Sequence, residues 1–432
     1  MFSLHLTSKP KLHLRLGWLV LCPVLLVFQQ ARANEPDLSV TAPAVTHIDP
    51  VVIDSQLTLP KLIELTLEKY PDATWLTALE EEAVAINQRS QSYTAGASQA
   101  SVGYQSMSTF KLNYATANVQ VHLWNLGQKD AQHKLANEAE NSVQTQVAAI
   151  KLRVAGLVRA ALWDMELAKI RFEQAEKELD IYQKLANTIK RRVDLGDLPR
   201  ADELLARTEL LQKRSVYTLA EAESMHARKR YTSVTQTTKL PLRFDENLVA
   251  SKEIGQNHPG LLAINSQIAR KQAELNALKA TGSGQSSVVA GILSDEGTDS
   301  RSNKAEFFNI GINIPFGGSA HIAPQIAAVN VELNRLIADR AQLMRDLEQA
   351  HHEAEHNLEV NEVELATANE QKTVSEELLN MTQLAFSVGE IDLMDLLKIQ
   401  SRTQQAILNA KERAVMLQRD KAFYNQAVGV MP

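Results

Sequence analysis

The chain of 432 residues has only one cysteine and few aromatic residues, and its prolines leave two long gaps. Cys22, the only cysteine, lies in an N-terminal apolar run, so disulfides and thiol chemistry are excluded from the rest of the chain. No proline occurs between Pro71 and Pro199, or between Pro324 and Pro432. Because proline interrupts helices, these gaps permit helices far longer than those of ordinary α/β enzymes, whose frequent loops need turn residues.

The first 33 residues have the features of a secretory signal peptide. A basic stretch through Arg15 precedes an apolar run over 16–28, and Ala31-Arg32-Ala33 supplies a small-x-small cleavage pattern. The apolar run is shorter than the roughly 20 residues that a spanning helix needs. We therefore predict cleavage after residue 33 rather than a membrane anchor. The cysteine lies within the run instead of behind it, which disfavours lipidation.

The charge of the exported chain is clearly negative. The formal net charge is −6, and the predicted signal peptide carries four basic residues and no acid, so its removal leaves −10. This charge excludes nucleic acid as the main partner. No later segment reaches 18 consecutive apolar residues, so the sequence predicts no transmembrane helix. A β-barrel stays possible, because its strands show alternation rather than a long apolar run.

Two segments alternate between apolar and polar residues with the period of a strand. In the first, Val119 and Val121 are separated by glutamine and followed by histidine. In the second, asparagine and glycine separate four large apolar residues, which are Phe308, Ile310, Ile312 and Ile314. With the apolar stretches upstream of each, these segments predict two β-hairpins, at about 99–124 and about 286–315.

A long helical pattern follows each hairpin and stops at a glycine, and a second helical pattern follows that glycine. Apolar residues spaced by three and four, with much alanine and many charges, are typical of closely packed coiled helices. Gly196 and Gly389 are 193 residues apart, and so are Asp202 and Asp395. The sequence therefore predicts an internal duplication, with an extended arm over 34–56, a first repeat over 57–240 and a second over 241–432.

The two glycine turns and the ends of the two hairpins carry a family resemblance. The turns read Arg192-Val193-Asp194-Leu195-Gly196-Asp197-Leu198 and Phe386-Ser387-Val388-Gly389-Glu390-Ile391, and the second hairpin ends in Ile312-Asn313-Ile314-Pro315-Phe316-Gly317. In this duplicated arrangement the chain resembles the TolC-type outer-membrane efflux proteins over about 57–429. It looks most similar to those that serve heavy-metal cation exporters.

The resemblance implies a mainly α fold with a β-barrel portion. Three copies would each give four strands to a shared 12-stranded barrel in outer-membrane lipid, and long antiparallel coiled helices would form a tunnel through the periplasm of a Gram-negative bacterium. A periplasmic adaptor protein and an inner-membrane pump of the RND type would be the partners. The implied function is export of cargo, heavy-metal cations by the closer likeness, with no catalytic group and no cofactor.

The resemblance also assigns site residues. Gly196, Leu198, Gly389 and Ile391 would form the periplasmic tip and the adaptor-docking surface. Three further residues, Asp202, Asp395 and Lys398, would lie at the aperture or gate. Lys398 stands where the family often has an acid, and it could pair with Asp395 along the helix or across the threefold axis. The apolar residues at 308, 310, 312 and 314 would face lipid, and the asparagines between them would face a wet lumen.

A competing motif lies in the second long helical pattern. His352-Glu353-Ala354-Glu355-His356 matches the H-E-x-x-H pattern of zinc peptidases, in which two histidines bind the metal and the glutamate acts as base. A peptidase needs a third ligand delivered by a chain that turns back, and the helical pattern runs on unbroken to residue 389. We therefore expect no enzyme, and hold His352 and His356 as weak metal candidates only. The other alternative is a periplasmic coiled-coil scaffold without a channel.

Overall fold

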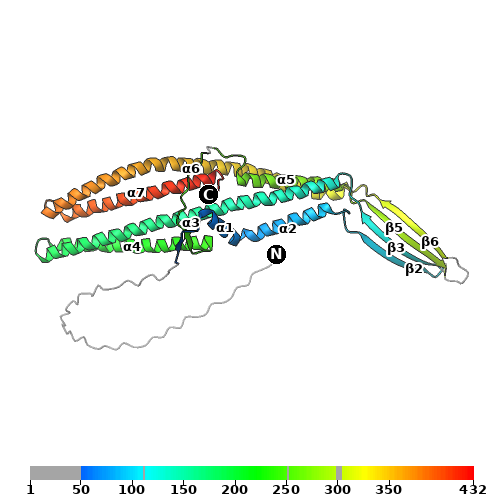
Figure 1. Cartoon of the computed structure of the whole chain (residues 1–432), viewed down its shortest axis with the longest axis horizontal. Coiled ribbons are helices and arrows are strands. Elements are labelled where there is room, and N and C mark those ends of the chain that lie inside the picture. The colour runs from blue at the N-terminus through cyan, green and yellow to red at the C-terminus, as the bar shows by residue number, and fades with distance from the viewer. Residues whose placement is uncertain (1–49, 110–111, 251–252, 298–303) are drawn as a thin grey trace, which may run out of the picture. The chain divides into compact units, whose positions relative to one another are not determined.

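The structure is a computed structural model that describes residues 50–432 except 110–111, 251–252 and 298–303 (Figure 1). The predicted signal peptide over 1–33 and residues 34–49 of the predicted arm lie outside the described residues. Within the remainder of the arm, β1 (Val52–Asp54) pairs in parallel with β4 (Lys239–Pro241), which lies at the boundary between the two predicted repeats.

Both repeats contain the same order of elements. In each, a shorter helix leads into two strands, a very long helix and a last helix. The first repeat opens with an additional helix, α1 (Leu59–Lys69), and continues with α2 (Asp72–Gln91), β2 (Gln99–Met107), β3 (Leu112–His122), α3 (Gln128–Asp194) and α4 (Arg200–Thr235). The second comprises α5 (Pro259–Thr281), β5 (Ser287–Gly297), β6 (Lys304–Asn313), α6 (Ser319–Val388) and α7 (Leu393–Ala427). The expected mainly α fold and its duplication are confirmed.

The proline-free gaps hold the two long helices. α3 has 67 residues and α6 has 70, so each is about 100 Å long at 1.5 Å per residue. α3 begins directly after Gly127, whose φ is +72°, and α6 begins two residues after Gly317, whose φ is +71°. Both glycines are in the left-handed region. Such a φ is disfavoured for other residues, so these glycines allow the chain to reverse from strand into helix.

The four long strands form one antiparallel sheet in the order β2-β3-β5-β6. The sequence predicts two hairpins, and the structure joins them edge to edge through β3 and β5, with Val121 opposite Val288 and Val119 opposite Ala290. No local pattern signals this pairing, because the two strands are far apart in the sequence. The joined sheet gives all four strands a common pair of faces.

The helices follow the order of the strands to which they connect (Figure 1). α3 packs on α2 and α5, and α5 packs on α6, so the helices that adjoin the sheet have the order α2-α3-α5-α6. Away from the sheet, α4 takes the place of α2 beside α3, and α7 takes the place of α5 between α3 and α6. The outer helices of this layer are therefore α2 and α4 on one side and α6 on the other.

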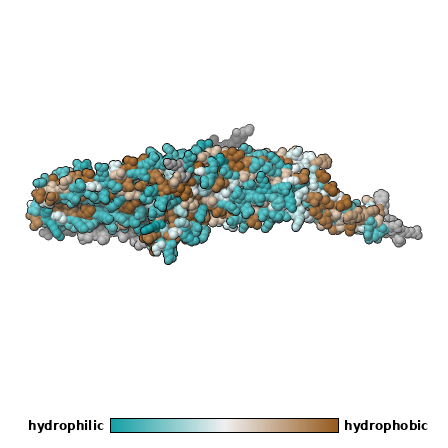
Figure 2. Space-filling model, turned by 45° about the horizontal axis from the view of Figure 1, so that its top comes forward, coloured by the Kyte–Doolittle hydropathy of each residue, from teal (hydrophilic) through white to brown (hydrophobic). Residues whose placement is uncertain are grey.

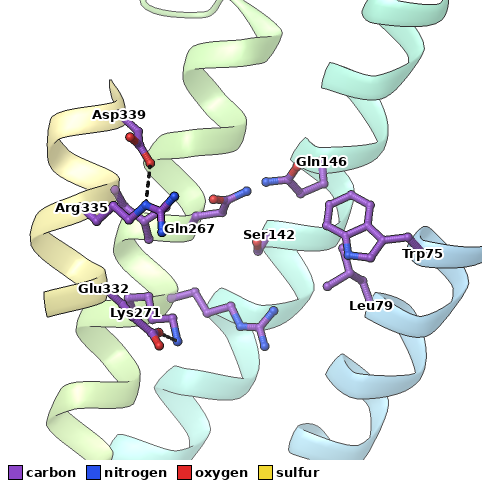
Figure 3. A pocket seen from close by; sticks show the side chains of 11 residues that line it. Trp75, Leu79, Ser142, Gln146, Gln267, Lys271, Glu332, Arg335 and Asp339 are labelled. Atoms are coloured by element: carbon purple, nitrogen blue, oxygen red, sulfur yellow. Dashed lines mark ion pairs between the residues drawn. The ribbon is translucent and has the colours of Figure 1, made fainter. Parts of the chain in front are cut away.

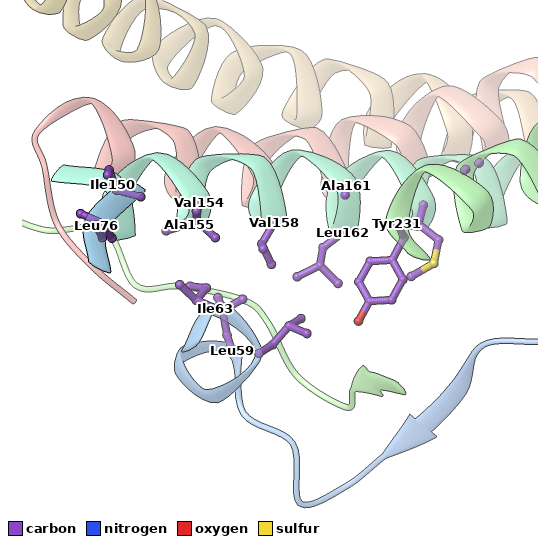
Figure 4. Close-up of a cluster of buried hydrophobic side chains, with 14 residues drawn as sticks. Leu59, Ile63, Leu76, Ile150, Val154, Ala155, Val158, Ala161, Leu162 and Tyr231 are labelled. Carbon is purple, nitrogen blue, oxygen red and sulfur yellow. The ribbon is translucent and has the colours of Figure 1, made fainter. Parts of the chain in front are cut away.

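The main hydrophobic cluster lies where α1 packs on the middle of α3 (Figure 4). Leu62 and Ile63 are completely buried against Val154 and Val158, and Tyr231 of α4 is also completely buried. Burying one such aliphatic side chain stabilises the fold by about 1.5–3 kcal/mol. This cluster fixes α1 and the end of α4 to α3 at the level where α2 gives way to α4.

Candidate functional site

The two faces of the four-stranded sheet differ sharply in polarity. Paired residues of an antiparallel sheet point to the same face, so the register assigns every side chain. Among the paired residues of this sheet, seven of the eight large apolar side chains that are 50% to 87% exposed lie on one face, and these are Val102, Tyr104, Val119, Ile292, Phe308, Ile310 and Ile312. The eighth, Phe307, lies on the other face. Figure 2 shows the apolar surface gathered over the strands. Ile314 is equally exposed but lies just beyond the end of β6.

The opposite face is mostly polar. Gln120 of β3 donates from Nε2 to Oγ of Ser287 on β5 at 2.9 Å, and Asn313 of β6 donates from Nδ2 to the same oxygen at 3.4 Å. These two bonds cross three strands. Asn118 and Asn309 point to the same side. A sheet with one apolar face and one polar, hydrogen-bonding face suits a boundary between lipid and water.

Both outer edges of the sheet are unpaired within the described residues. β2 bonds only to β3, and β6 bonds only to β5. Each edge therefore presents backbone N–H and C=O groups that a neighbouring strand could satisfy.

The first helix–helix turn closes around Gly196, whose φ is +84°. The N–H of Gly196 donates to the Val193 carbonyl at 3.0 Å, and the N–H of Asp197 donates to the Arg192 carbonyl at 2.8 Å. These bonds satisfy the last carbonyls of α3 in the manner of a Schellman turn. Leu198 follows, half-buried, and its chain neighbour Pro199 is the N-cap residue of α4.

The second turn repeats this geometry at Gly389, whose φ is +83°. Its N–H donates to the Phe386 carbonyl at 3.2 Å, and the next N–H donates to the Ala385 carbonyl at 3.0 Å. Asp392 then caps α7, because its carboxylate accepts from the N–H of Asp395 at 2.8 Å. This cap was not among the predicted features, although an acid three residues before another at a helix start is its usual signal.

The two turns belong to one packed cluster rather than to two separate tips. Leu198 and Ile391 are half-buried against the same buried side chains, which are Tyr182, Ile189, Ala206, Leu379, Phe386, Leu393, Leu396 and Leu397. The guanidinium of Arg192 lies 5.3 Å from the centre of the Phe386 ring, which adds a cation–π contact between the two helical hairpins. Within this chain, Leu198 and Ile391 pack between the two helical hairpins, and adaptor docking by either residue stays a prediction.

The charged candidates lie at the start of the last helix of each repeat. Asp202 is half-buried in the first turn of α4, while Asp395 and Lys398 are exposed on α7. Within the described part of the chain, no ion pair joins Asp395 to Lys398, so the pairing along the helix does not form. A ring of these acids around an aperture stays a prediction.

Similarity to solved structures covers most of the chain. No protein-family model matches the sequence, and no curated protein matches it. The chain is similar to a structure of CusC, reported with conformational changes that accompany folding and transmembrane channel formation. The two are 14% identical with a TM-score of 0.68, over 88% of this chain and 93% of CusC. The outer membrane protein VceC of Vibrio cholerae is 12% identical with a TM-score of 0.67, over 86% of this chain and 96% of VceC.

The open state of the MtrE outer membrane channel of Neisseria gonorrhoeae is 16% identical with a TM-score of 0.65, over 86% of this chain and 89% of MtrE. The chain has the fold of the TolC-type outer-membrane channels. The expected fold class is thereby confirmed.

A cavity of about 460 Å³ lies between α2, α3, α5 and α6 of the TolC-type fold (Figure 3). Trp75 and Leu79 form its apolar side. Each charged side chain of its lining has an ion-pair partner, since Lys271 lies 2.5 Å from Glu332, Arg335 lies 3.9 Å from Asp339, and Arg270 lies 2.5 Å from Glu82 outside the lining. A cavity with neutralised charges carries no specific ligand chemistry.

The histidine motif lies on an uninterrupted stretch of α6. His352, Glu353 and His356 are exposed, and Glu353 accepts from Nε2 of Gln349 at 2.8 Å. Among the described residues, no group of three or more histidine, cysteine, aspartate or glutamate side chains has the geometry of a metal site. The third ligand that a zinc peptidase needs is therefore not delivered by those residues.

None of the described helices is both long enough and apolar enough to cross a membrane.

Proposed function

We propose that this chain is the outer-membrane channel subunit of a tripartite efflux system, reaching from the outer membrane into the periplasm. The observation that carries the proposal is the sheet, with one exposed apolar face, one polar face and two open edges. In lipid, an open edge would leave backbone groups without partners at a cost of several kcal/mol each. Further copies of the chain must therefore complete the sheet into a closed barrel, and three copies would give the expected homotrimer.

The C-terminal half of α6 supports this assembly because it has two apolar faces, one buried and one exposed. One face is buried and includes Leu379, Thr382 and Phe386. Two residues after each comes an exposed apolar side chain, Met381, Leu384 and Val388, with exposures of 63% to 68%. A shift of two residues is about 200° around a helix, so these side chains point away from the rest of the chain. A second buried face on α6 would complete a ring of helices.

The opposite edge of the helical layer offers a matching surface on α4. Leu204 and Leu211 are exposed there, and Arg207 and Arg214 flank them. The outward face of α6 carries acids among its apolar residues, Glu370 and Glu377. In a closed ring, α4 of one copy would lie antiparallel to α6 of the next, with apolar residues packed and opposite charges adjacent.

The tip is the proposed docking surface for a periplasmic adaptor and an inner-membrane RND-type pump. Arg192, Leu198, Phe386 and Ile391 hold the two hairpins together, so an opening movement must loosen this contact. Exposed Asp395, repeated by symmetry, would focus negative potential on cargo that passes the aperture. Such a conduit needs no catalytic group, and we assign no enzyme activity and no cofactor.

The proposed cargo is heavy-metal cations. Support comes from the sequence likeness to the cation-exporter class, from the charge of −10 without the predicted signal peptide and from the exposed acids at the tip. Negative charge along a pore favours cations over anions.

The experiment that tests the channel is electrical. The protein extracted in detergent should migrate as a heat-modifiable trimer and should produce single-channel steps in a planar bilayer. A trimer or monomer that is soluble without detergent and gives no conductance would instead support a periplasmic scaffold. Deletion followed by parallel exposure to divalent metals, silver or copper and hydrophobic antibiotics tests the cargo, since sensitivity to antibiotics alone would contradict the metal class while leaving the channel intact.

A further inference from the structure

His352 and His356 form an exposed pair on α6 that the channel function does not use. Their rings lie 6.5 Å apart between centres and are nearly parallel, with an interplanar angle of 17°. Ala354 and Leu358 are the buried residues of this turn, so the two histidines lie on the other side of the helix. Neither ring has a hydrogen bond or an ion pair to any described residue, whereas neighbouring His351 lies 3.3 Å from the hydroxyl of Tyr424.

The spacing of four residues is the one that lets two histidines on a helix share a metal ion. Side chains at i and i+4 lie above one another, about 5–6 Å apart at Cβ. Rotation of each exposed ring about its side-chain torsions can then turn one nitrogen from each toward a common ion. Imidazole nitrogen is a preferred ligand of Zn²⁺, Cu²⁺ and Ni²⁺. The pair is not committed to structure, so such rotation breaks no described contact.

The surrounding charge draws cations to the pair. Residues 346–371 contain eight carboxylates and no lysine or arginine. Glu353 and Glu355 lie within the motif itself, and the first of these is oriented by Gln349. A cluster of partly exposed carboxylates, with no basic residue among them, raises the local concentration of a divalent cation.

We propose that His352 and His356 chelate a divalent transition-metal ion, with water completing its coordination. Both ligands come from a single helix, so this site does not depend on the proposed channel function. Affinity should follow the general order for nitrogen ligands, with Cu²⁺ bound most tightly and Zn²⁺ and Ni²⁺ more weakly. This is a binding site and not a peptidase centre, because the described residues deliver no third ligand to it.

The test uses the full-length mature protein, as its detergent-extracted assembly, titrated with Cu²⁺ and with Zn²⁺ by calorimetry. Cu²⁺ binding is also followed by electron paramagnetic resonance, which reports nitrogen ligands directly. His352→Ala and His356→Ala should each weaken binding by about tenfold or more. His226→Ala removes an exposed histidine of α4 and should leave binding unchanged.

A second control keeps the number of histidines and changes only their spacing. The double variant His356→Ala with Asn357→His places the second ring five residues from His352, about 140° away around the helix. It should bind no better than His356→Ala alone. Equal binding by this variant and the wild type, or a wild type that binds neither ion, would overturn the proposal.

Discussion

Arg159 of α3 forms a two-pronged ion pair with Glu246, a residue of the segment that joins the two repeats. Nε and one terminal nitrogen of Arg159 donate to the two carboxylate oxygens at 2.7 and 2.6 Å, and the side chains are 0% and 7% exposed. The other terminal nitrogen donates to Oε1 of Gln426 at 2.5 Å, and the terminal nitrogen that binds Glu246 also donates to the Val430 carbonyl at 3.1 Å. One buried guanidinium therefore ties the first long helix to the linker and to the C-terminal end.

Removing one partner of this pair should be costly. Glu246→Gln leaves the buried guanidinium without its counter-charge, and loss of one member of a buried pair typically costs about 3–5 kcal/mol. We expect a marked fall in the temperature at which the assembly dissociates. Asp180→Asn provides the matched control, since it breaks an exposed pair with Lys184 and should change that temperature little.

The double variant Arg159→Met with Glu246→Leu distinguishes loss of charge balance from loss of packing. Because it buries no unpaired charge, it should recover much of the stability lost in Glu246→Gln. Equal losses in the single and the double variant would show that the pair acts through shape rather than through charge.

Much of the fold could be predicted from the sequence because the information is local. A helix needs no proline in its interior, a strand such as β6 shows alternation, and a tight turn needs a glycine such as Gly196 or Gly389. Each of these signals concerns only residues that are close together in the sequence. The pairing of β3 with β5 could not be predicted from pattern alone, since antiparallel register between distant strands leaves no local signal. The contact of Arg192 with Phe386 could not be predicted for the same reason, since it joins residues almost 200 positions apart in the sequence.

The candidate site was predicted less completely than the fold. Glycine turns are readable because only glycine adopts a φ near +84° without strain. The cap at Asp392 has a local sequence signal, because Asp392 lies three residues before Asp395, whose N–H is the donor. Whether Asp202 and Asp395 form rings depends on symmetry between copies, which one chain does not contain.

Stability should depend on pH through His258, the residue that caps α5. Its Nδ1 accepts from the N–H of Gly260 at 3.1 Å, which requires an unprotonated nitrogen, and burial lowers the pKa of this imidazole. The unfolded chain, with the ordinary histidine pKa near 6.5, binds the proton more readily. Stability from this group is therefore complete above about pH 6.5 and is lost as the pH falls toward the lowered pKa.

His258→Asn separates this effect from the other titrations. Asparagine still accepts a capping hydrogen bond but does not titrate. Thermal dissociation between pH 7.5 and 5.5 should fall less steeply in the variant, with a difference of up to about 1.4 kcal/mol per pH unit. Identical pH profiles would mean that His258 has the same pKa in the folded and unfolded states, and therefore does not cap the helix through an unprotonated nitrogen.

The charge of Asp395 should control ion passage through the tip. Asp395→Ala removes an exposed carboxylate but keeps the N–H that the Asp392 cap uses, so the turn should hold its shape. In planar bilayers we expect a higher single-channel conductance and a weaker preference for cations. Asp392→Asn is the matched control, because it removes a charge three residues away and retains a capping side chain. Unchanged conductance and selectivity in Asp395→Ala would rule out a gate at this position.

Assembly should depend on the outward face of α6 and not on its exposed surface in general. Met381 is 63% exposed in one chain and would be buried in the proposed ring, whereas its neighbour Asn380 is exposed and polar. Met381→Asp would then bury an unpaired carboxylate at every interface, at a cost of about 2 kcal/mol or more each. Asn380→Asp adds the same charge one position, or about 100°, around the helix. Native gel electrophoresis should show dissociation for Met381→Asp and an intact assembly for Asn380→Asp. If both variants remain fully assembled, α6 does not meet a neighbouring copy through this face.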